Sequence, residues 1–442
     1  MSLATPRRLL LPALIAAFAL ALVPTLANAG GHGSKGHGSK VHHRVALHKH
    51  GKHHGHKGHR GHGHGGHHGH GHGHGHGHPG HPGGGDSGRG HEVNVMTRNL
   101  YLGADLGPAI GAPSLEAFVA ANGKILNEVT ANNFPVRAKG LADEILDKAP
   151  DLVGLQEVAL WRTGPPSLTP VLTSEPTATT VRYDYLQLLL DRLNAKKPQY
   201  EVAIAQDEFD LEAPADENGV AGDNPDSNPA IANAEINGRL TMRDVILVRR
   251  GAGVQIANPQ SGNFETLLAV PILGQPLTIK RGWTATDAKV RGSGWFRFVN
   301  THLEAFDPAQ LVPSIRALQA AELVAPGGPA ADGELPVVLL GDLNSDDDTV
   351  EPGDQQAYRV LLEAGLVERS TNDPLSCCLK SSLLAEDAGG SVADFDHQVD
   401  HVMTDDPDGV ELRSSSVTGL LPVNGFWNSD HAGVFSALRF DR

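Results

Sequence analysis

An α/β fold, with helices outside a sheet of mixed strand direction, is the architecture that this sequence predicts. Three observations predict it. Short apolar runs alternate with stretches of helical periodicity, polar residues gather where the apolar runs end, and this regular pattern begins only after residue 90. Continuous apolar runs are typical of strands buried on both faces. The block 91–442 is long enough for one large domain with a substantial core.

The first 29 residues predict a signal peptide. Arg7 and Arg8 supply a basic start, Leu9 to Val23 form an apolar run too short to span a bilayer comfortably, and Ala27 to Ala29 give a small-x-small cleavage pattern. No later stretch is long and apolar enough for a transmembrane anchor. We therefore expect a secreted, extracellular protein, and the Ala/Leu-rich signal indicates a bacterial source.

Residues 30–90 consist mainly of Gly, His, Lys and Ser, and 20 of the 25 histidines lie between His32 and His81. Such a composition has too little apolar surface to bury, so it predicts a disordered linker. Dense neutral imidazoles bind Zn²⁺, Ni²⁺ or Cu²⁺ in many interchangeable geometries. A flexible linker without a metal role explains the segment as well.

The first half of the folded block begins with a buried strand. In chain order it predicts a strand at 92–100, helices at 114–130 and 136–148, a strand at 151–158, a helix at 185–196, and strands at 200–205 and 242–249. The intervening segment 207–238 is acidic and rich in Asn, Pro and Gly, which predicts a long surface excursion.

In the second half, strands at 283–290 and 294–302 are expected to pair across a short glycine-containing turn. Leu311, Ile315, Leu318 and Glu322 fall on helical spacing, with the apolar members expected to face the core. Three further strands are predicted at 335–340, 398–403 and 433–438.

Charge limits the partners. The chain has 36 basic and 51 acidic residues; ten of the basic and one of the acidic residues precede position 91, so the folded block carries a net charge of −24. This charge disfavours extended nucleic-acid binding, although a bound divalent cation would reverse the sign locally. The only cysteines, Cys377 and Cys378, are neighbours, and in an oxidising compartment we expect a vicinal disulfide over a reduced buried pair.

Polar residues follow the apolar strands where each strand ends, and this pattern predicts a catalytic cleft. Strand ends of a rigid sheet present side chains to a common site. The polar clusters are Asn99, Gln156-Glu157, Asn300-Thr301-His302, Gly341-Asp342-Leu343-Asn344, Asp400-His401 and Ser429-Asp430-His431.

These side chains suit the hydrolysis of phosphodiesters, which needs a cation at the phosphate, a base for the attacking water and help for the leaving oxygen. Oxygen ligands such as Glu157 and Asn99 suit Mg²⁺ or Mn²⁺ better than Zn²⁺. Histidine beside a buried carboxylate supplies an acid or a base. Singly, each cluster is equally explained as a turn, a helix cap or an exposed strand end.

In this order, the motifs resemble those of the endonuclease/exonuclease/phosphatase family, which includes pancreatic-type deoxyribonuclease, AP endonucleases, neutral sphingomyelinases and inositol polyphosphate 5-phosphatases. The resemblance covers nearly all of 91–442. It implies a four-layer α/β/β/α sandwich of two mixed sheets with one cleft between the sheet edges.

The resemblance also implies roles for single residues. Glu157 matches the principal metal ligand, with Asn99 assisting, and Asp430 a further metal or histidine-orienting carboxylate. Asp342 and Asn344 match the pair that positions the attacking water and a phosphate oxygen. The remaining roles belong to His431 (general base or phosphate-stabilising histidine), Asp400 (its orienting carboxylate), His302 (donor to phosphate or leaving group) and Arg243 (phosphate-binding cation).

The first motif departs from the commoner Trp-Asn form, and its Asp105 is expected to stabilise a turn rather than bind metal. His401 need not be catalytic. The signatures of the 5-phosphatases are absent, which argues against that subfamily.

We therefore predict a secreted divalent-metal-dependent phosphodiesterase with nuclease-like activity and a phosphodiester substrate, and no protein partner is implied. A sphingomyelinase-like phospholipase C is the first alternative, with the apolar segment 264–277 either entering the membrane surface or packing in the core. A non-catalytic exported metal-binding protein is the second.

Overall fold

The computed structural model describes residues 91–440 except 174, 221, 223, 225–228, 307–310, 348–353, 371–374, 388–393 and 407. The chain divides into two units, Met1–His81 and Pro82–Arg442, and every described residue lies in the second. The predicted signal peptide and His-rich linker lie outside the described residues. No helix in the described ranges is long and apolar enough to cross a membrane.

Helices and strands alternate in the first half of this unit, as the sequence predicts. The helices are α1 (Gly107–Ile110), α2 (Leu115–Ala131), α3 (Phe134–Lys148), α4 (Thr169–Thr173), α5 (Tyr185–Leu193), α6 (Ile315–Val324) and α7 (Gln356–Glu363), with a 3-10 turn η1 (Pro229–Ile231). The strands are β1 (His91–Asn99), β2 (Leu152–Gln156), β3 (Leu160–Gly164), β4 (Thr180–Asp184), β5 (Tyr200–Ala215), β6 (Ile236–Arg249), β7 (Gln255–Asn263), β8 (Leu268–Ile272), β9 (Gln275–Ile279), β10 (Gly282–Lys289), β11 (Phe296–His302), β12 (Val337–Asp342), β13 (Val367–Glu368), β14 (Asp400–Thr404), β15 (Val410–Thr418) and β16 (Gly433–Phe440).

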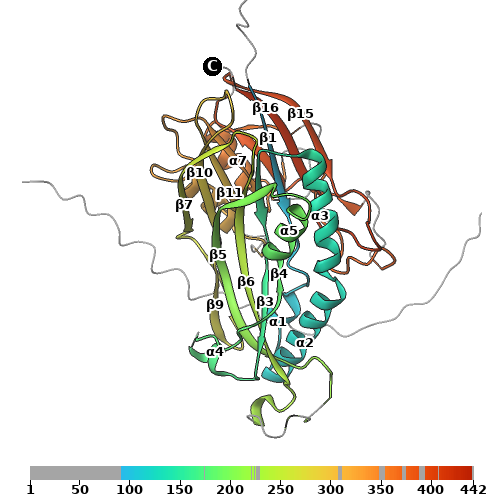
Figure 1. The fold of residues 1–442 in the computed structure, drawn as a ribbon. Helices are drawn as coiled ribbons and strands as arrows, with labels where there is room; N and C mark the ends of the chain where they lie inside the picture. The colour runs from blue at the N-terminus through green and yellow to red at the C-terminus, as the bar shows by residue number, and fades with distance from the viewer. Residues whose placement is uncertain are drawn as a thin grey trace, which may run out of the picture. The chain divides into compact units, whose positions relative to one another are not determined.

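Two large sheets contain most of these strands (Figure 1). The first has the order β15-β16-β1-β2-β6-β3-β4, with β5 paired to β6, and the second has the order β13-β14-β12-β11-β10-β7. Both are mixed, because β1 runs parallel to β2 and β11 runs parallel to β12 while the other pairs are antiparallel. The prediction of two mixed sheets is confirmed.

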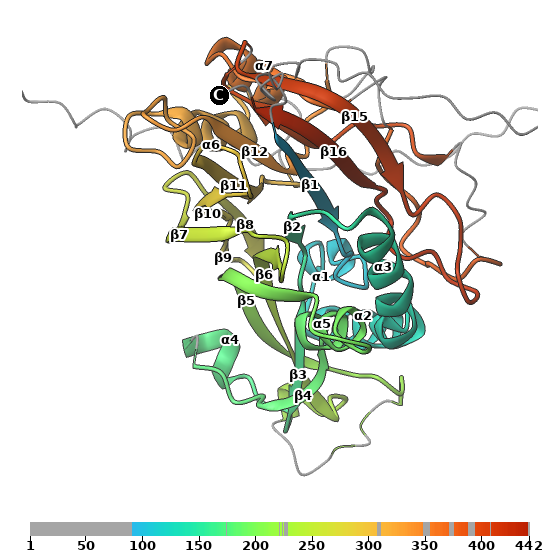
Figure 2. The same cartoon turned by 45° about the horizontal axis from the view of Figure 1, so that its top comes forward.

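Successive side chains of each strand point to opposite faces of its sheet, so the apolar core is divided into separate clusters. Val93 and Val95 of β1 pack with Phe298 of β11 and Leu340 of β12 between the two sheets. Met96, on the opposite face of β1, joins the core beneath α2, α3 and α5. A third cluster packs α6 and α7 on the second sheet. Helices therefore cover the outer face of each sheet, as the turned view also shows (Figure 2).

Close approach of the sheets requires glycine at one position of β2. A Cβ at Gly154 would lie 2.2 Å from Leu340 Cδ1 and 2.6 Å from Asn300 Oδ1. Those distances are far below van der Waals contact, so any side chain there would push the sheets apart. Gly154 thus sets the spacing at which β2 and β11 present their final residues.

The excursion predicted for 207–238 is shorter in the structure than in the prediction, because both of its ends are strands and only 216–235 connect them. β5 continues to Ala215 and β6 begins at Ile236, so the two form a long antiparallel ribbon. Acidic residues are accommodated because they have partners: the carboxylate of Asp210 pairs with Arg239 on the facing strand, and Glu212 accepts a 2.7 Å hydrogen bond from Asn237. Composition indicated a loop, whereas pairing across the strands decided the structure.

One apolar segment differs from its predicted role, and a second follows one of the two roles predicted for it. Helix α6 begins at Ile315 and buries Ala317, Ala320 and Leu323, whereas Leu311 and Leu318 are exposed. The small alanines lie on the sheet because they allow a closer approach than leucine would. Segment 264–277 contains strand β8 and the start of β9, and its Phe264, Leu268 and Ile272 are buried in the core, whereas Ala269 and Pro271 between them are exposed.

Candidate active site

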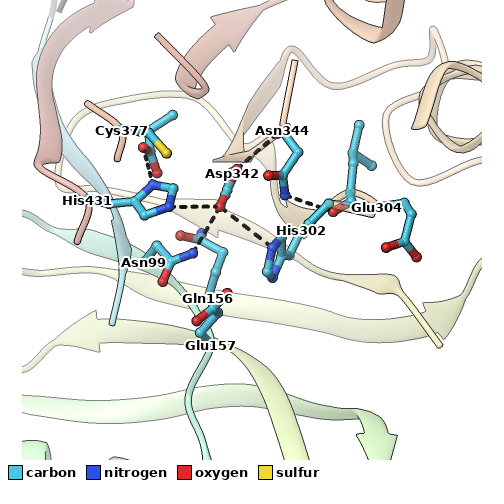
Figure 3. A network of polar contacts seen from close by, with 12 residues as sticks. Asn99, Gln156, Glu157, His302, Glu304, Asp342, Asn344, Cys377 and His431 are labelled. Atoms are coloured by element: carbon cyan, nitrogen blue, oxygen red, sulfur yellow. Dashed lines mark hydrogen bonds and ion pairs between the residues drawn. The ribbon is translucent and has the colours of Figure 1, made fainter. Parts of the chain in front are cut away.

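The strand ends meet at one place in this fold. The Cα partners in the sheets are Asn99 and Gln156, His302 and Asp342, and Asp342 and Asp400. Since these residues end or begin adjacent strands, pairing alone puts five of the six predicted clusters beside a partner, two in the first sheet and three in the second. Figure 3 shows Asn99, His302 and His431 directed toward Asp342.

Asp342 is the centre of the cluster and is buried. Its Oδ2 accepts a 2.9 Å hydrogen bond from Asn99 Nδ2, and its Oδ1 accepts one of 2.9 Å from the backbone N–H of Asn344. Oδ2 also lies 3.6 Å from His302 Nε2 and 3.7 Å from His431 Nε2. One carboxylate therefore contacts both histidines that the sequence selected.

His431 is oriented by Asp400, as predicted. Its Nδ1 lies 2.8 Å from Asp400 Oδ2, which leaves Nε2 directed at Asp342 (Figure 3). Burial alone would lower the pKa of the imidazole, but the negative charges of Asp400, Asp342 and Asp430 outweigh it and raise the pKa well above its usual value. The protein residues alone thus hold His431 as an imidazolium.

Glu157 and Asp430 complete an acidic group at the same edge. The backbone N–H of Leu102 donates to Glu157 Oε2 at 2.6 Å, while Ser429 Oγ donates to Asp430 Oδ1 at 3.3 Å. Burial raises the pKa of Glu157 and of Asp342, and it raises that of Asp430 to about 6. Grouping such carboxylates at one partly buried edge is unfavourable unless a cation joins them.

The donor set therefore fits a hard divalent cation. Glu157, Asp342 and Asp430 offer carboxylate oxygens, which Mg²⁺ and Mn²⁺ prefer. Ligand-type atoms of Asp342, Asp400 and His431 lie within 4.8 Å of one another, but an imidazolium has no lone pair for a metal ion, so the carboxylates are the donors. Asn99 is fixed in place by two hydrogen bonds: its amide Nδ2 donates to Asp342, and its Oδ1 accepts the Tyr101 N–H at 2.8 Å.

A buried amide network supports these residues. Gln156 Nε2 donates to Asn300 Oδ1 at 2.6 Å, which links the end of β2 in the first sheet to β11 in the second. Asn344 Nδ2 donates to the carbonyl of Leu303 at 3.0 Å. Both Glu157 and Asn344 have positive φ, 53° and 46°, so each chain turns sharply directly after its strand.

Arg281 is the site residue that the sequence analysis missed. Its Nη1 lies 3.0 Å from His302 Nδ1, and its guanidinium is almost wholly buried. Burial and the charge of Arg281 lower the pKa of His302 well below its usual value, which keeps that imidazole neutral. Arg281 precedes β10 and has no polar motif around it, so only its position beside His302 identifies it.

Two carboxylates accompany Arg281 in the interior. Glu208 and Asp244 are buried, and their side-chain oxygens have no hydrogen-bond partner among the described residues. Burial raises the pKa of both well above the usual value, whereas the positive charge of Arg281 lowers it. Their raised pKa favours the neutral acids, so the carboxylate that pairs with the buried guanidinium is that of Glu304, whose Oε1 lies 3.9 Å from Arg281 Nη2.

Other selected residues have different surroundings. Arg243 pairs with Asp184 at 2.6 Å and donates to the carbonyl of Val158, so its guanidinium is engaged beside the site. Asp105 accepts a turn hydrogen bond from Gly107 N–H at 2.8 Å, as expected. His401 contacts Glu368 at 2.7 Å and the carbonyl of Ser345 at 3.0 Å, away from the catalytic cluster.

The two cysteines lie against the active site. Cys377 and Cys378 form the expected vicinal disulfide, and Cys378 Sγ lies 3.9 Å from His431 Nε2. The loop that contains them also receives hydrogen bonds from the end of the chain, since Leu379 N–H donates to the Asp430 carbonyl at 2.9 Å. The disulfide is thus part of the wall around His431.

No protein-family model matches this chain, and no curated protein matches it. Among solved structures, an endonuclease/exonuclease/phosphatase from Beutenbergia cavernae is 20% identical, with a TM-score of 0.43, over 79% of this chain and 72% of that chain. A family protein from Bacteroides thetaiotaomicron is 15% identical (TM-score 0.45; 80% of this chain, all of that chain). One from Leptotrichia buccalis is 12% identical (TM-score 0.46; 79% of this chain, all of that chain). The solved structures that this chain is similar to are consistently of the endonuclease/exonuclease/phosphatase family, the family that its motifs resemble.

Proposed function

We propose that this chain is a secreted, divalent-metal-dependent phosphodiesterase. The observation that carries the proposal is the position of Asp342, which contacts His302, His431 and Asn99 while His431 is paired with Asp400. Carboxylates that can hold a cation, together with histidines and an arginine beside them, can supply the charge neutralisation and proton transfer that phosphodiester hydrolysis uses. Secretion is supported by residues 1–29.

The reaction needs only water besides the phosphodiester. The oxygen of a water molecule bonds to phosphorus, the bond from phosphorus to the leaving oxygen breaks, and one water proton ends on the leaving alcohol. Asp342 would orient the water and accept a proton, since burial raises the pKa of its carboxyl. Asn344, held to Asp342 through its backbone N–H, would position a phosphate oxygen.

The two histidines would contact the phosphate and the leaving group. His431, held as an imidazolium by Asp400, would donate to a non-bridging phosphate oxygen or to the leaving group. His302, kept neutral beside Arg281, would donate one hydrogen bond to the phosphate. Glu157 and Asp430 would hold Mg²⁺ or Mn²⁺, which would neutralise phosphate charge and lower the pKa of a bound water.

Nuclease-like activity stays the prediction from sequence, and a sphingomyelinase-like phospholipase C stays its alternative. A parallel assay decides the reaction class: bis-p-nitrophenyl phosphate, plasmid DNA, RNA and sphingomyelin, each with Mg²⁺, Mn²⁺ or a chelator. We expect metal-dependent hydrolysis that Asp342→Asn abolishes. Absence of hydrolysis of all four substrates, or full activity in the chelator, would refute the proposal and favour the non-catalytic metal-binding protein.

A further inference from the structure

A cavity of about 630 Å³ opens directly beside the catalytic residues. Glu157, Asp430 and Arg281 line it at the end of the sheet where the strands present the site, together with Lys380. From there it continues between the first sheet, helices α1 and α2, and the β8–β9 hairpin. Its volume is in the range of pockets that bind small molecules, ~300–1,000 Å³.

The walls beyond the catalytic end are predominantly apolar. They include Phe118, Trp161, Phe209, Met242, Ile272 and Ile279, all of which are buried. Of the polar residues in the wall, Asn122 donates its amide to the carbonyl of Pro214, at 3.1 Å. Water in such a space finds few hydrogen-bond partners, and apolar walls without a neighbour lose packing energy.

The cavity is also long enough to hold a chain. Met242 and Gly238 both line it along β6, and four residues of a strand extend ~13 Å. Because Gly238 has no side chain, only its backbone forms the cavity wall at that position. At the rim Phe306 is 44% exposed and adds an apolar surface beside the entrance. The charged lining residues are therefore few: Glu157, Arg281, Lys380 and Asp430 at the catalytic end, and Asp105 before α1, while the remaining wall is mostly apolar.

We propose that this cavity binds the apolar chain of the substrate, so that the natural substrate is a phosphodiester in which one esterified group is a long alkyl or acyl-bearing alcohol. The inference rests on the proposed function. It places the phosphate between the acidic cluster and Arg281, with the chain between α2 and β6. Nucleotides beside a cleaved bond carry polar bases and phosphates, which these walls could not satisfy, so this inference selects a lipid-like diester over the nuclease-like activity predicted from sequence.

The test uses the full chain with Mg²⁺ or Mn²⁺ and a series of alkyl p-nitrophenyl phosphate diesters, from methyl to dodecyl, each below its critical micelle concentration. Below that concentration no micelles form, so the alkyl chain can bury its apolar surface only by entering the protein. We expect kcat/KM to rise about fourfold per methylene at first and to level off when the cavity is filled.

Variants locate the effect. Ala109 of α1 and Ala213 of β5 both line the cavity, so Ala109→Phe and Ala213→Phe should each lower the dodecyl-to-methyl ratio of kcat/KM by about tenfold or more. Ala195 is exposed after α5, and Ala195→Phe should leave the ratio unchanged.

The outcomes are distinguishable. Equal kcat/KM for methyl and dodecyl esters in the wild type would overturn the inference while leaving the phosphodiesterase intact. The same holds if both cavity variants fold, as judged by near-UV circular dichroism, and retain the full chain-length dependence. Lack of hydrolysis of every diester, including bis-p-nitrophenyl phosphate, would instead overturn the proposed function itself.

Discussion

Nδ1 of His431 lies 2.8 Å from Oδ2 of Asp400, and both side chains are buried, so the orientation of this imidazole depends on one carboxylate. We expect Asp400→Asn to lower kcat/KM by about 10²–10⁴-fold, because the amide neither orients the protonated ring nor stabilises its charge. A pH–rate profile should show the limb assigned to His431 moved to lower pH. Asp396→Asn, at an exposed position, is the matched control, and equal profiles for the two variants would exclude this role of Asp400.

Glu157 is expected to be required for metal binding. Glu157→Gln keeps the shape and the hydrogen bond from Leu102 but removes the charge that a cation needs. We expect turnover to be lost and Mn²⁺ affinity, measured by calorimetry, to fall sharply while circular dichroism is unchanged. Exposed Glu116→Gln should behave like the wild type. Normal Mn²⁺ affinity in Glu157→Gln would exclude Glu157 as a principal ligand.

Arg281 should influence both the substrate and His302. Arg281→Gln removes a buried cation beside the imidazole, so kcat/KM should fall about 10²-fold and the pKa of His302 should rise toward its usual value. Imidazole resonances followed by NMR across pH measure the second effect. Arg250, half exposed at the surface, provides the control Arg250→Gln. If the His302 pKa is the same in both variants, Arg281 does not control that histidine.

The pair of Glu368 and His401 predicts a pH window for stability. Burial opposes both charges, but their mutual attraction raises the pKa of His401 above 6.5 and lowers that of Glu368 below 4.5. The histidine contribution is complete below pH 6.5 and is lost as pH rises through its folded pKa. The glutamate contribution is complete above pH 4.5 and is lost as pH falls through its folded pKa.

Both contributions are therefore present between about pH 4.5 and 6.5. We expect the difference in Tm between the wild type and His401→Gln to be largest in that range and to shrink at higher pH. Thermal unfolding at several pH values measures this difference. A difference that stays constant up to pH 9 would show that packing of the ring, rather than its charge, stabilises the fold.

Removal of residues 30–90 separates the His-rich segment from catalysis. All of the catalytic residues lie after position 91, and the described unit contains its own core. We expect the deletion variant to keep the wild-type kcat/KM and to lose most Ni²⁺ or Zn²⁺ binding, measured on an affinity resin. An inactive variant that is still folded would show that the segment contributes to the site.

The sequence by itself determined the elements whose signal is local. The apolar run Leu152 to Leu155 and the polar residues that follow it identified both a buried strand and a site position. The same holds for Val337 to Asp342, because a buried parallel strand needs continuous apolar residues and can present polar ones only at its end. The order of such motifs was enough to select Asp342, Asp400 and His431.

Only the tertiary structure decided the features that depend on partners distant in the chain. Asp210 and Glu212 became strand residues because Arg239 and Asn237 face them, and composition alone could not reveal that pairing. Arg281 joined the site because β10 pairs with β11 and places it beside His302. The apolar cavity beside Glu157 likewise lies between strands and helices that contribute only a few residues each. Side-chain contacts and empty space are properties of packing, which no single segment encodes.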